Sequence, residues 1–178
     1  MITSGKAPTP QRRAQLPPSA DELGQLGTTL RRTVPSEWQD FNGHVNVKHH
    51  YSFHIEALHT RFLALGLTPD YLQRHGQSTF TLEQHLTFYK EVLTGNEVTG
   101  HVRLLSRNAK LIHGVTFMAD RASGKVSSMV EFVDGHVDLT DRRTAPWQPE
   151  LADSLDEVLA EHRQLVWHPP LSGAMGLR

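Results

Sequence analysis

The chain has 178 residues, of which 38% are hydrophobic, so it is long enough to form one domain with a buried core. Its formal net charge of −1 gives no electrostatic reason to expect nucleic acid or a membrane surface as a partner. The absence of cysteine excludes disulfides and thiolate chemistry, and no membrane-spanning run or signal peptide is recognisable, so we expect a cytoplasmic protein.

The first part of the chain combines a polar, proline-rich stretch with two short elements. Residues 1–19 are rich in Pro, Gly, Ser and Thr, which is typical of a flexible tail. The segment 19–23 predicts one short helical turn. Residues 28–34 alternate loosely and end at Pro35, which predicts a first strand.

The stretch 38–47 is the most informative part of the sequence. It places a carboxylate, a carboxamide and an imidazole at alternate positions, Asp40, Asn42 and His44, before the predicted start of a helix at Asn46. These groups are a candidate base or nucleophile, an orienting amide and a proton donor, and the helix start offers backbone N–H groups to an oxyanion. The alternative is a polar loop in which an Asp or Asn only caps the helix.

A long amphipathic helix is predicted over residues 47–65, and Gly66 is a natural residue to follow its end. The spacing of four, four, three, four and three residues between its apolar positions places them on one stripe, and most of its histidines fall on other faces. The stripe consists of Val47, Tyr51, Ile55, Leu58, Phe62 and Leu65.

Period-two alternation then predicts a strand over residues 80–89. Glu83 and His85 share one face of this strand with Thr81, Thr87 and Tyr89. That face is either exposed to solvent or lines a cleft, in which Glu83 would bind a cationic group or a catalytic water.

Three more strands are predicted over residues 98–104, 111–119 and 126–137, joined by short turns. A helix follows over residues 153–163 with Asp153 or Ser154 as its N-cap, and the chain ends in a tail over 167–178. This order predicts an α+β fold, a long central helix on an antiparallel sheet. We divide the chain into a tail (1–19), one domain (20–150) and a C-terminal helix with its tail (151–178).

Metal and nucleotide sites have little support in the sequence. His50 and His54 have the i, i+4 spacing of half a zinc site, but no H-E-x-x-H pattern is present, so we expect no metal. Phosphate-binding and dinucleotide-binding glycine motifs are also absent, and we expect no cofactor.

The segment Asp40-Phe41-Asn42-Gly43-His44-Val45-Asn46, followed by a long helix and antiparallel strands, resembles the hotdog-fold acyl-CoA thioesterases of the 4-hydroxybenzoyl-CoA thioesterase type. Their pattern is an Asp three residues before Gly-His-Val-Asn-Asn, followed by a Tyr. Here Val47 replaces the second Asn, and His50 occupies the usual place of the Tyr, which is displaced to Tyr51. The resemblance covers residues 33–146.

Later segments are similar to the thioesterases associated with carnitine and betaine metabolism, which act on betainyl-CoA or related trimethylammonium acyl-CoA esters. The similar residues are 78–85, Leu104-Leu105, Lys110-Leu111-Ile112-His113, Glu131, His136-Val137-Asp138 and 142–146.

The resemblance implies that Asp40 is the nucleophile or general base and that Asn42 and His44 belong to the catalytic machinery. It further implies an acyl-CoA substrate, of which coenzyme A is a part, and a site at the interface of a homodimer or a tetramer. We expect Glu83 to bind a quaternary ammonium group together with an aromatic side chain. The full predicted substrate-binding set is Trp38, Phe41, Asn46, Val47, Glu83, His85 and Tyr89.

Three alternatives stay open. A thioesterase for medium-chain or aromatic acyl-CoA would not place a buried Glu83 beside its uncharged acyl group. A non-catalytic hotdog module that binds acyl-CoA has no evident need for Asp40. A dehydratase would require an Asp/His arrangement that the sequence lacks.

Overall fold

The computed structural model describes residues 16–177, so most of the predicted N-terminal tail lies outside the described part of the chain. A 3-10 helix at Ser36–Trp38 precedes the loop of interest. The helices are α1 (Ala20–Gly24), α2 (Val47–Ala64), α3 (Pro69–His75) and α4 (Pro149–Arg163), and the strands are β1 (Leu30–Thr33), β2 (Gln77–Phe88), β3 (Glu97–Arg107), β4 (Leu111–Asp120), β5 (Val126–Asp138) and β6 (Arg143–Thr144).

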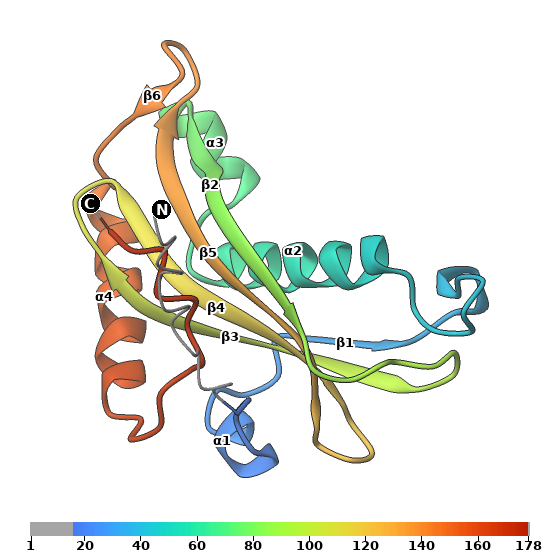
Figure 1. Cartoon of the computed structure of the whole chain (residues 1–178). Coiled ribbons are helices and arrows are strands. Elements are labelled where there is room, and N and C mark those ends of the chain that lie inside the picture. Colours follow the sequence, from blue (N-terminus) through green and yellow to red (C-terminus); the bar gives the residue numbers. More distant parts are fainter. Residues whose placement is uncertain (1–15, 178) are drawn as a thin grey trace, which may run out of the picture.

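The strands form one antiparallel sheet in the order β1-β3-β4-β5-β2, and the short β6 pairs with β5. Figure 1 shows that strands β2 to β5 are long and that the sheet is strongly twisted. The predicted antiparallel sheet with helices is therefore confirmed. Within the described chain β2 pairs with β5 alone, so its other edge is open.

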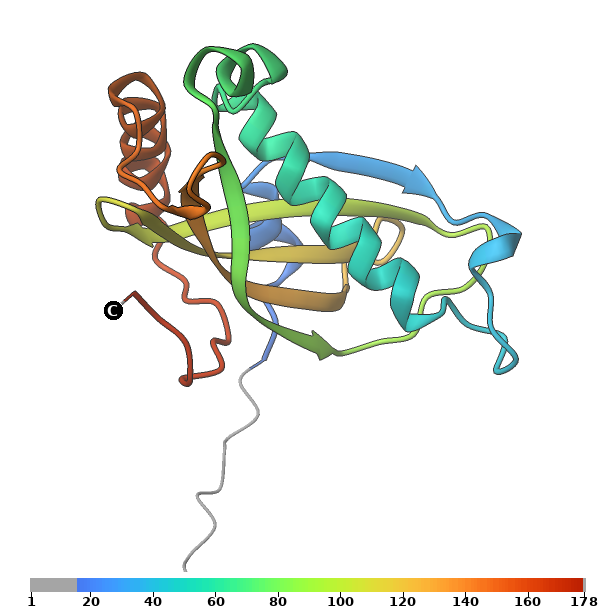
Figure 2. The ribbon, with the colours of Figure 1, turned by 90° about the horizontal axis from the view of Figure 1, so that it is seen from above.

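Helix α2 crosses one face of the sheet (Figure 2) and packs on it through Phe53, Ala57 and Phe62. A Cβ added at Gly100 of β3 would lie 3.0 Å from the Ala57 Cβ and 3.2 Å from the Phe53 ring, so a side chain there would crowd the packed helix. The glycine thus lets the middle of α2 pack closely on β3.

The predicted apolar stripe of α2 is wrong in its first half. Val47 and Tyr51 are 54% and 42% exposed, whereas His50 and His54 are buried. The reason is chemical, because the facing sheet presents the Ser128 hydroxyl, which hydrogen-bonds both imidazoles. A buried polar side chain with a partner is tolerated, and hydrophobic periodicity cannot detect it.

Strand β2 contains a β-bulge, so, contrary to the prediction, its side chains do not alternate between the two faces throughout. Thr81 pairs with Asp134 and Glu83 with the adjacent Val133, so one extra residue stands between the two pairs. Thr81 and Glu83 therefore lie on opposite faces of the sheet, although they are two apart in sequence. Glu83 and His85 still share a face, which is the one opposite to α2.

The last helix begins earlier than the pattern predicts. Pro149 occupies its first turn, Gln148 is the N-cap residue, and the Ser154 hydroxyl donates to the Glu150 carbonyl inside the helix. Proline is favoured in a first helical turn because it lacks an N–H to be satisfied there. The predicted domain boundary at residue 150 thus falls within α4, whose Leu155 packs in the same core as α2.

The segment after α4 is packed against the sheet, which corrects the predicted C-terminal tail. Trp167 is buried, and its indole N–H donates to the Gln25 side chain. Arg103 donates to the Trp167 carbonyl, and the Glu131 carboxylate accepts the Ser172 N–H at 2.6 Å. Residues 167–172 therefore cover the sheet face opposite to α2.

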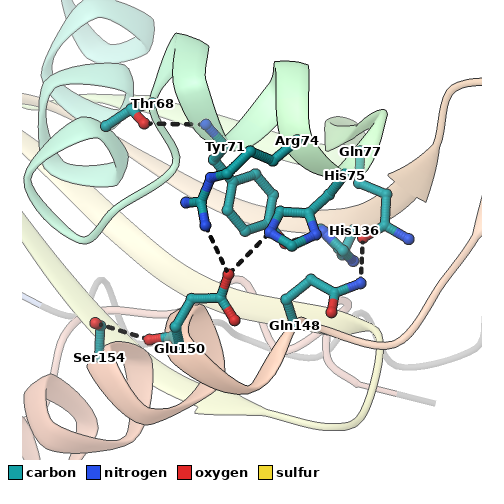
Figure 3. A network of polar contacts seen from close by, with 9 residues as sticks. All are labelled: Thr68, Tyr71, Arg74, His75, Gln77, His136, Gln148, Glu150 and Ser154. Carbon is teal, nitrogen blue, oxygen red and sulfur yellow. Dashed lines mark hydrogen bonds and ion pairs between the residues drawn. The ribbon is translucent and has the colours of Figure 1, made fainter.

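A polar network joins α3, β5 and α4 at the far end of α2 (Figure 3). His75 contacts the Glu150 carboxylate at 2.9 Å. The fully buried Tyr71 hydroxyl lies 2.9 Å from Nε2 of His136. Since Nδ1–H of His136 donates to the Ala145 carbonyl, Nε2 accepts the Tyr71 proton.

The variant Tyr71→Phe tests this network. It leaves a buried imidazole nitrogen without a donor, so we expect the free energy of unfolding to fall by about 1–3 kcal/mol in urea denaturation. Tyr51→Phe is the matched control, because Tyr51 is partly exposed and no described residue hydrogen-bonds its hydroxyl. Equal losses in both variants would refute the assigned role of Tyr71.

Candidate active site

The Asp40 loop is a tight reversal held by its own backbone. The Asp40 N–H donates to the His44 carbonyl at 2.9 Å, and the Asp40 carbonyl accepts the Gly43 N–H at 3.1 Å. One Asp40 carboxylate oxygen accepts the Asn42 N–H at 2.8 Å. Gly43 has a φ of +85°, which side-chain-bearing residues rarely adopt, so the glycine of the motif is required by this turn.

Asn46 caps α2, as its position in the motif predicts. Its side-chain oxygen accepts the Lys48 N–H at 3.1 Å. The backbone N–H groups of Val45 and Asn46 are also occupied, by the carbonyls of Val92 and Trp38. Among the described residues, none accepts the N–H of Val47. Of the backbone N–H groups at residues 45–47 that were predicted to bind an oxyanion, only that of Val47 is therefore free to do so in the described part of the chain.

Two pockets flank the start of α2. Asp40 and Asn46 line one of about 370 Å³, and His44 and Val47 line another of about 380 Å³. The structure therefore places Asp40 and His44 on two sides of the helix start. The remaining lining residues are Glu37, Gln39, Phe41, Lys48 and His49 in the first pocket, and Val45, His50, Phe88, Tyr89, Lys90 and Glu91 in the second.

His44 has a carboxylate partner that the sequence did not indicate. Its Nε2 lies 2.9 Å from a Glu91 oxygen, and both side chains are partly exposed. Glu91 follows β2 and lies 51 residues after Asp40 in the sequence. No spacing rule relates it to the Asp40 motif. Phe88, half exposed beside Tyr89, is a second lining residue that sequence reasoning missed.

Two of the three predicted aromatic residues, Trp38 and Phe41, lie outside this second pocket. Trp38 is buried, its ring is stacked on His49 at 5.0 Å, and the Arg32 guanidinium lies 5.5 Å from its ring centroid. Phe41 is fully exposed at the tip of the loop and lines the Asp40 pocket. Tyr89 lines the His44 pocket, and burial raises its pKa above the ordinary value.

Besides Trp38, three predicted site residues line neither pocket. Asn42 is exposed in the loop, and Glu83 and His85 lie along β2 on the sheet face opposite to α2. Their roles in catalysis and substrate binding stay predictions. Glu83 does stand on the strand with the open edge, where a second copy of the chain is expected.

The described residues contain no group of three or more His, Cys, Asp or Glu side chains that could hold a metal ion. His50 and His54 contact hydroxyl groups instead. Within residues 16–177, no helix combines the length and the apolar character needed to cross a membrane.

Comparison with known proteins places this geometry in a family. A sequence model described as the thioesterase-like superfamily matches residues 34–155. The chain is 30% identical over 155 residues to a betainyl-CoA thioesterase of Pseudomonas aeruginosa, with 87% of this chain and 98% of that protein covered. It is 27% identical over 147 residues to an L-carnitine dehydrogenase/betainyl-CoA thioesterase of Rhizobium meliloti, with 83% of this chain and 29% of that protein covered.

The fold has solved counterparts. A protein of Staphylococcus aureus, solved in complex with CoA, superposes with a TM-score of 0.76 at 17% identity, and the match covers 84% of this chain and 94% of that one. The predicted class of enzyme, a thioester hydrolase, is confirmed by the matched family. The chain belongs to the thioesterase-like superfamily.

Proposed function

We propose that the protein hydrolyses the thioester of a small acyl-CoA that bears a trimethylammonium group, with betainyl-CoA as the first candidate. The observation that carries this proposal is the likeness to the betainyl-CoA thioesterase of P. aeruginosa along nearly the whole of that protein. The pockets beside α2 are compatible with it, because they supply a carboxylate, aromatic rings and a free backbone donor.

Asp40 is the proposed reactive carboxylate. As a general base it would take a proton from water, the resulting hydroxide would add to the thioester carbon, and the C–S bond would break to release CoA thiolate. As a nucleophile it would form a mixed anhydride that water then cleaves. Either route ends with the free acid and CoA, the thiolate taking up a proton.

The Val47 N–H is the proposed backbone donor to the carbonyl oxygen. It stands at the first residue of α2, where the helix dipole also favours negative charge. Asn46 stabilises the first turn of α2, because its side-chain oxygen accepts the Lys48 N–H. The departure from the family pattern at Val47 removes a side-chain amide but leaves this backbone donor.

The His44 pocket is the proposed site of the quaternary ammonium. Phe88 and Tyr89 offer aromatic faces, which attract a cation, and the Glu91 carboxylate adds negative charge. This set replaces Trp38 as the aromatic partner, because the Trp38 ring already contacts His49 and Arg32. Glu83 and His85 remain proposed contributors on β2.

We also propose a homodimer formed through β2. Its outer edge is unpaired in the described chain, and its Leu82 and Phe88 side chains are exposed, as are Val47 and Tyr51 in the first turns of α2. An open strand edge with exposed apolar neighbours is a surface that a second chain commonly covers.

Thiol release from a panel of acyl-CoAs tests the proposed function. The panel contains betainyl, short aliphatic, long aliphatic and benzoyl esters, and we expect betainyl-CoA to have the highest kcat/KM. A preference for long aliphatic or benzoyl esters would favour the uncharged-acyl alternative. No turnover of any ester by the folded protein would favour an acyl-CoA-binding module.

A further inference from the structure

Four buried polar side chains form a continuous chain from the sheet to the His44 pocket. Nδ1 of His50 lies 2.9 Å from the Ser128 hydroxyl, which lies 2.9 Å from Nε2 of His54. Nδ1 of His54 lies 2.7 Å from the Thr116 hydroxyl. Each of the four residues is at most 3% exposed, and the mechanism above uses none of them.

The Thr116 hydroxyl, at the inner end of this series, determines which group donates in each hydrogen bond. No described residue other than His54 hydrogen-bonds the Thr116 hydroxyl, so that hydroxyl satisfies its proton by donating to Nδ1 of His54. His54 then carries its own proton at Nε2 and donates it to Ser128. The opposite direction would leave the buried Thr116 proton without an acceptor.

Ser128 accepts from His54 and therefore donates its own hydroxyl proton to another group. Its hydroxyl has two candidate acceptors, the His50 imidazole nitrogen at 2.9 Å and the Met118 sulfur at 3.9 Å. A thioether is a weak acceptor, so the imidazole is preferred. His50 therefore accepts at Nδ1 and holds its proton at Nε2.

The outer end of the chain reaches the proposed acyl site. His50 lines the same pocket as Val47, and no residue in the described range hydrogen-bonds its Nε2. The Phe88 ring packs edge-on against the imidazole at 5.2 Å, which restrains its orientation. The pocket thus offers two N–H donors on one side of α2, the Val47 backbone and the His50 ring.

We propose that the Nε2–H of His50 donates a hydrogen bond to the oxyanion that develops from the thioester carbonyl, with Thr116, His54 and Ser128 as positioning residues that fix its tautomer. This inference rests on the proposed function. It also adds to it, since burial lowers the pKa of His50 to about 4 and the donor is neutral at pH 7. A neutral donor adds no positive charge beside a trimethylammonium acyl group.

The first test needs no substrate. Long-range ¹H–¹⁵N spectra of the full chain, with each histidine assigned by substitution, report which ring nitrogen carries the proton. We expect the Nε2–H tautomer for both His50 and His54. An Nδ1–H tautomer at His50 would overturn the proposal whatever the activity of the protein.

The second test is kinetic and uses whichever ester the wild type cleaves. His50→Phe keeps a planar ring but removes the donor, so kcat should fall about 100-fold with little change in KM. His50→Gln restores an N–H and should recover part of that loss. A folded His50→Phe variant with wild-type kcat would contradict the donor role.

Thr116→Val separates positioning from packing, because it keeps the side-chain shape and leaves His50 in place. We expect a kcat about tenfold lower together with a changed His50 tautomer signal. His59→Gln, at an exposed position of α2, is the control and should change neither. An unchanged kcat and an unchanged His50 tautomer in Thr116→Val would refute the positioning role of Thr116. A folded wild type without turnover would count against the proposed function. The measured tautomer of His50 would still test the hydrogen-bond directions from Thr116 to His50.

Discussion

Asp40→Asn is expected to lower kcat for a cleaved acyl-CoA by about 10²- to 10⁴-fold, the range that a positioned general base supplies. Asparagine has the same shape and can still accept the Asn42 N–H that holds the turn, so the loop should survive. It can neither take a proton from water nor attack the thioester. Thiol release under saturating substrate measures the loss, and KM should change little.

Asp153→Asn is the matched control for this substitution. Asp153 is exposed on α4, far along the chain from the Asp40 loop, and the same chemical change there should leave kcat as in the wild type. An Asp40→Asn protein that folds and keeps full turnover would remove Asp40 from the mechanism. The structure would then retain its fold assignment but lose its proposed reactive group.

The buried histidines of α2 are expected to make the fold less stable as the pH falls below about 6.5. Burial lowers the pKa of His50 to about 4 and that of His54 to about 3, whereas both would titrate near 6.5 in the unfolded chain. Below pH 6.5 the unfolded chain therefore binds protons that the folded protein does not. Stability falls as the pH drops from about 6.5 toward 4, by about 2 kcal/mol at pH 5 for each histidine.

Urea denaturation at pH 7.5 and at pH 5.0 measures this effect. His54→Gln should be less stable than the wild type at pH 7.5, but its loss between the two pH values should be about 2 kcal/mol smaller. His162, whose pKa burial lowers to about 4, contributes in the same direction in both proteins and cancels in the comparison. An equal pH dependence in wild type and variant would show that His54 is not buried in its neutral form.

The elements with strong local signals were predictable from sequence. The turns near residues 107–110 and 121–125 and the strands that they join follow from alternation and turn residues, and both lie where predicted. The Asp40 loop was also recognisable, because the φ of Gly43 and the cap at Asn46 are local requirements of the backbone. Such features depend on residues close in sequence.

Features that depend on the facing surface were not predictable. His50 and His54 look like polar surface residues until the hydroxyls of Ser128 and Thr116 are placed opposite them, from strands more than 60 residues away. The bulge between Thr81 and Glu83 changes which side chains share a face, and alternation in sequence carries no trace of it.

The partition of the site into two pockets has the same origin. Asp40 and His44 are four residues apart, yet the loop reverses between them and their side chains line different pockets beside the start of α2. His44 then pairs with Glu91, which β2 brings to it. Motif spacing identified the residues of the candidate site, and only the fold decides which of them share a pocket.

Two esters that differ in one atom of the acyl group test most directly whether the protein recognises a positive charge. Betainyl-CoA carries a quaternary nitrogen, and 3,3-dimethylbutanoyl-CoA has a carbon in its place with nearly the same shape. We expect the wild type to favour betainyl-CoA in kcat/KM by about tenfold or more, because a cation beside Phe88, Tyr89 and Glu91 gains attraction that a neutral group lacks. Equal kcat/KM values for the two esters would contradict recognition of the positive charge.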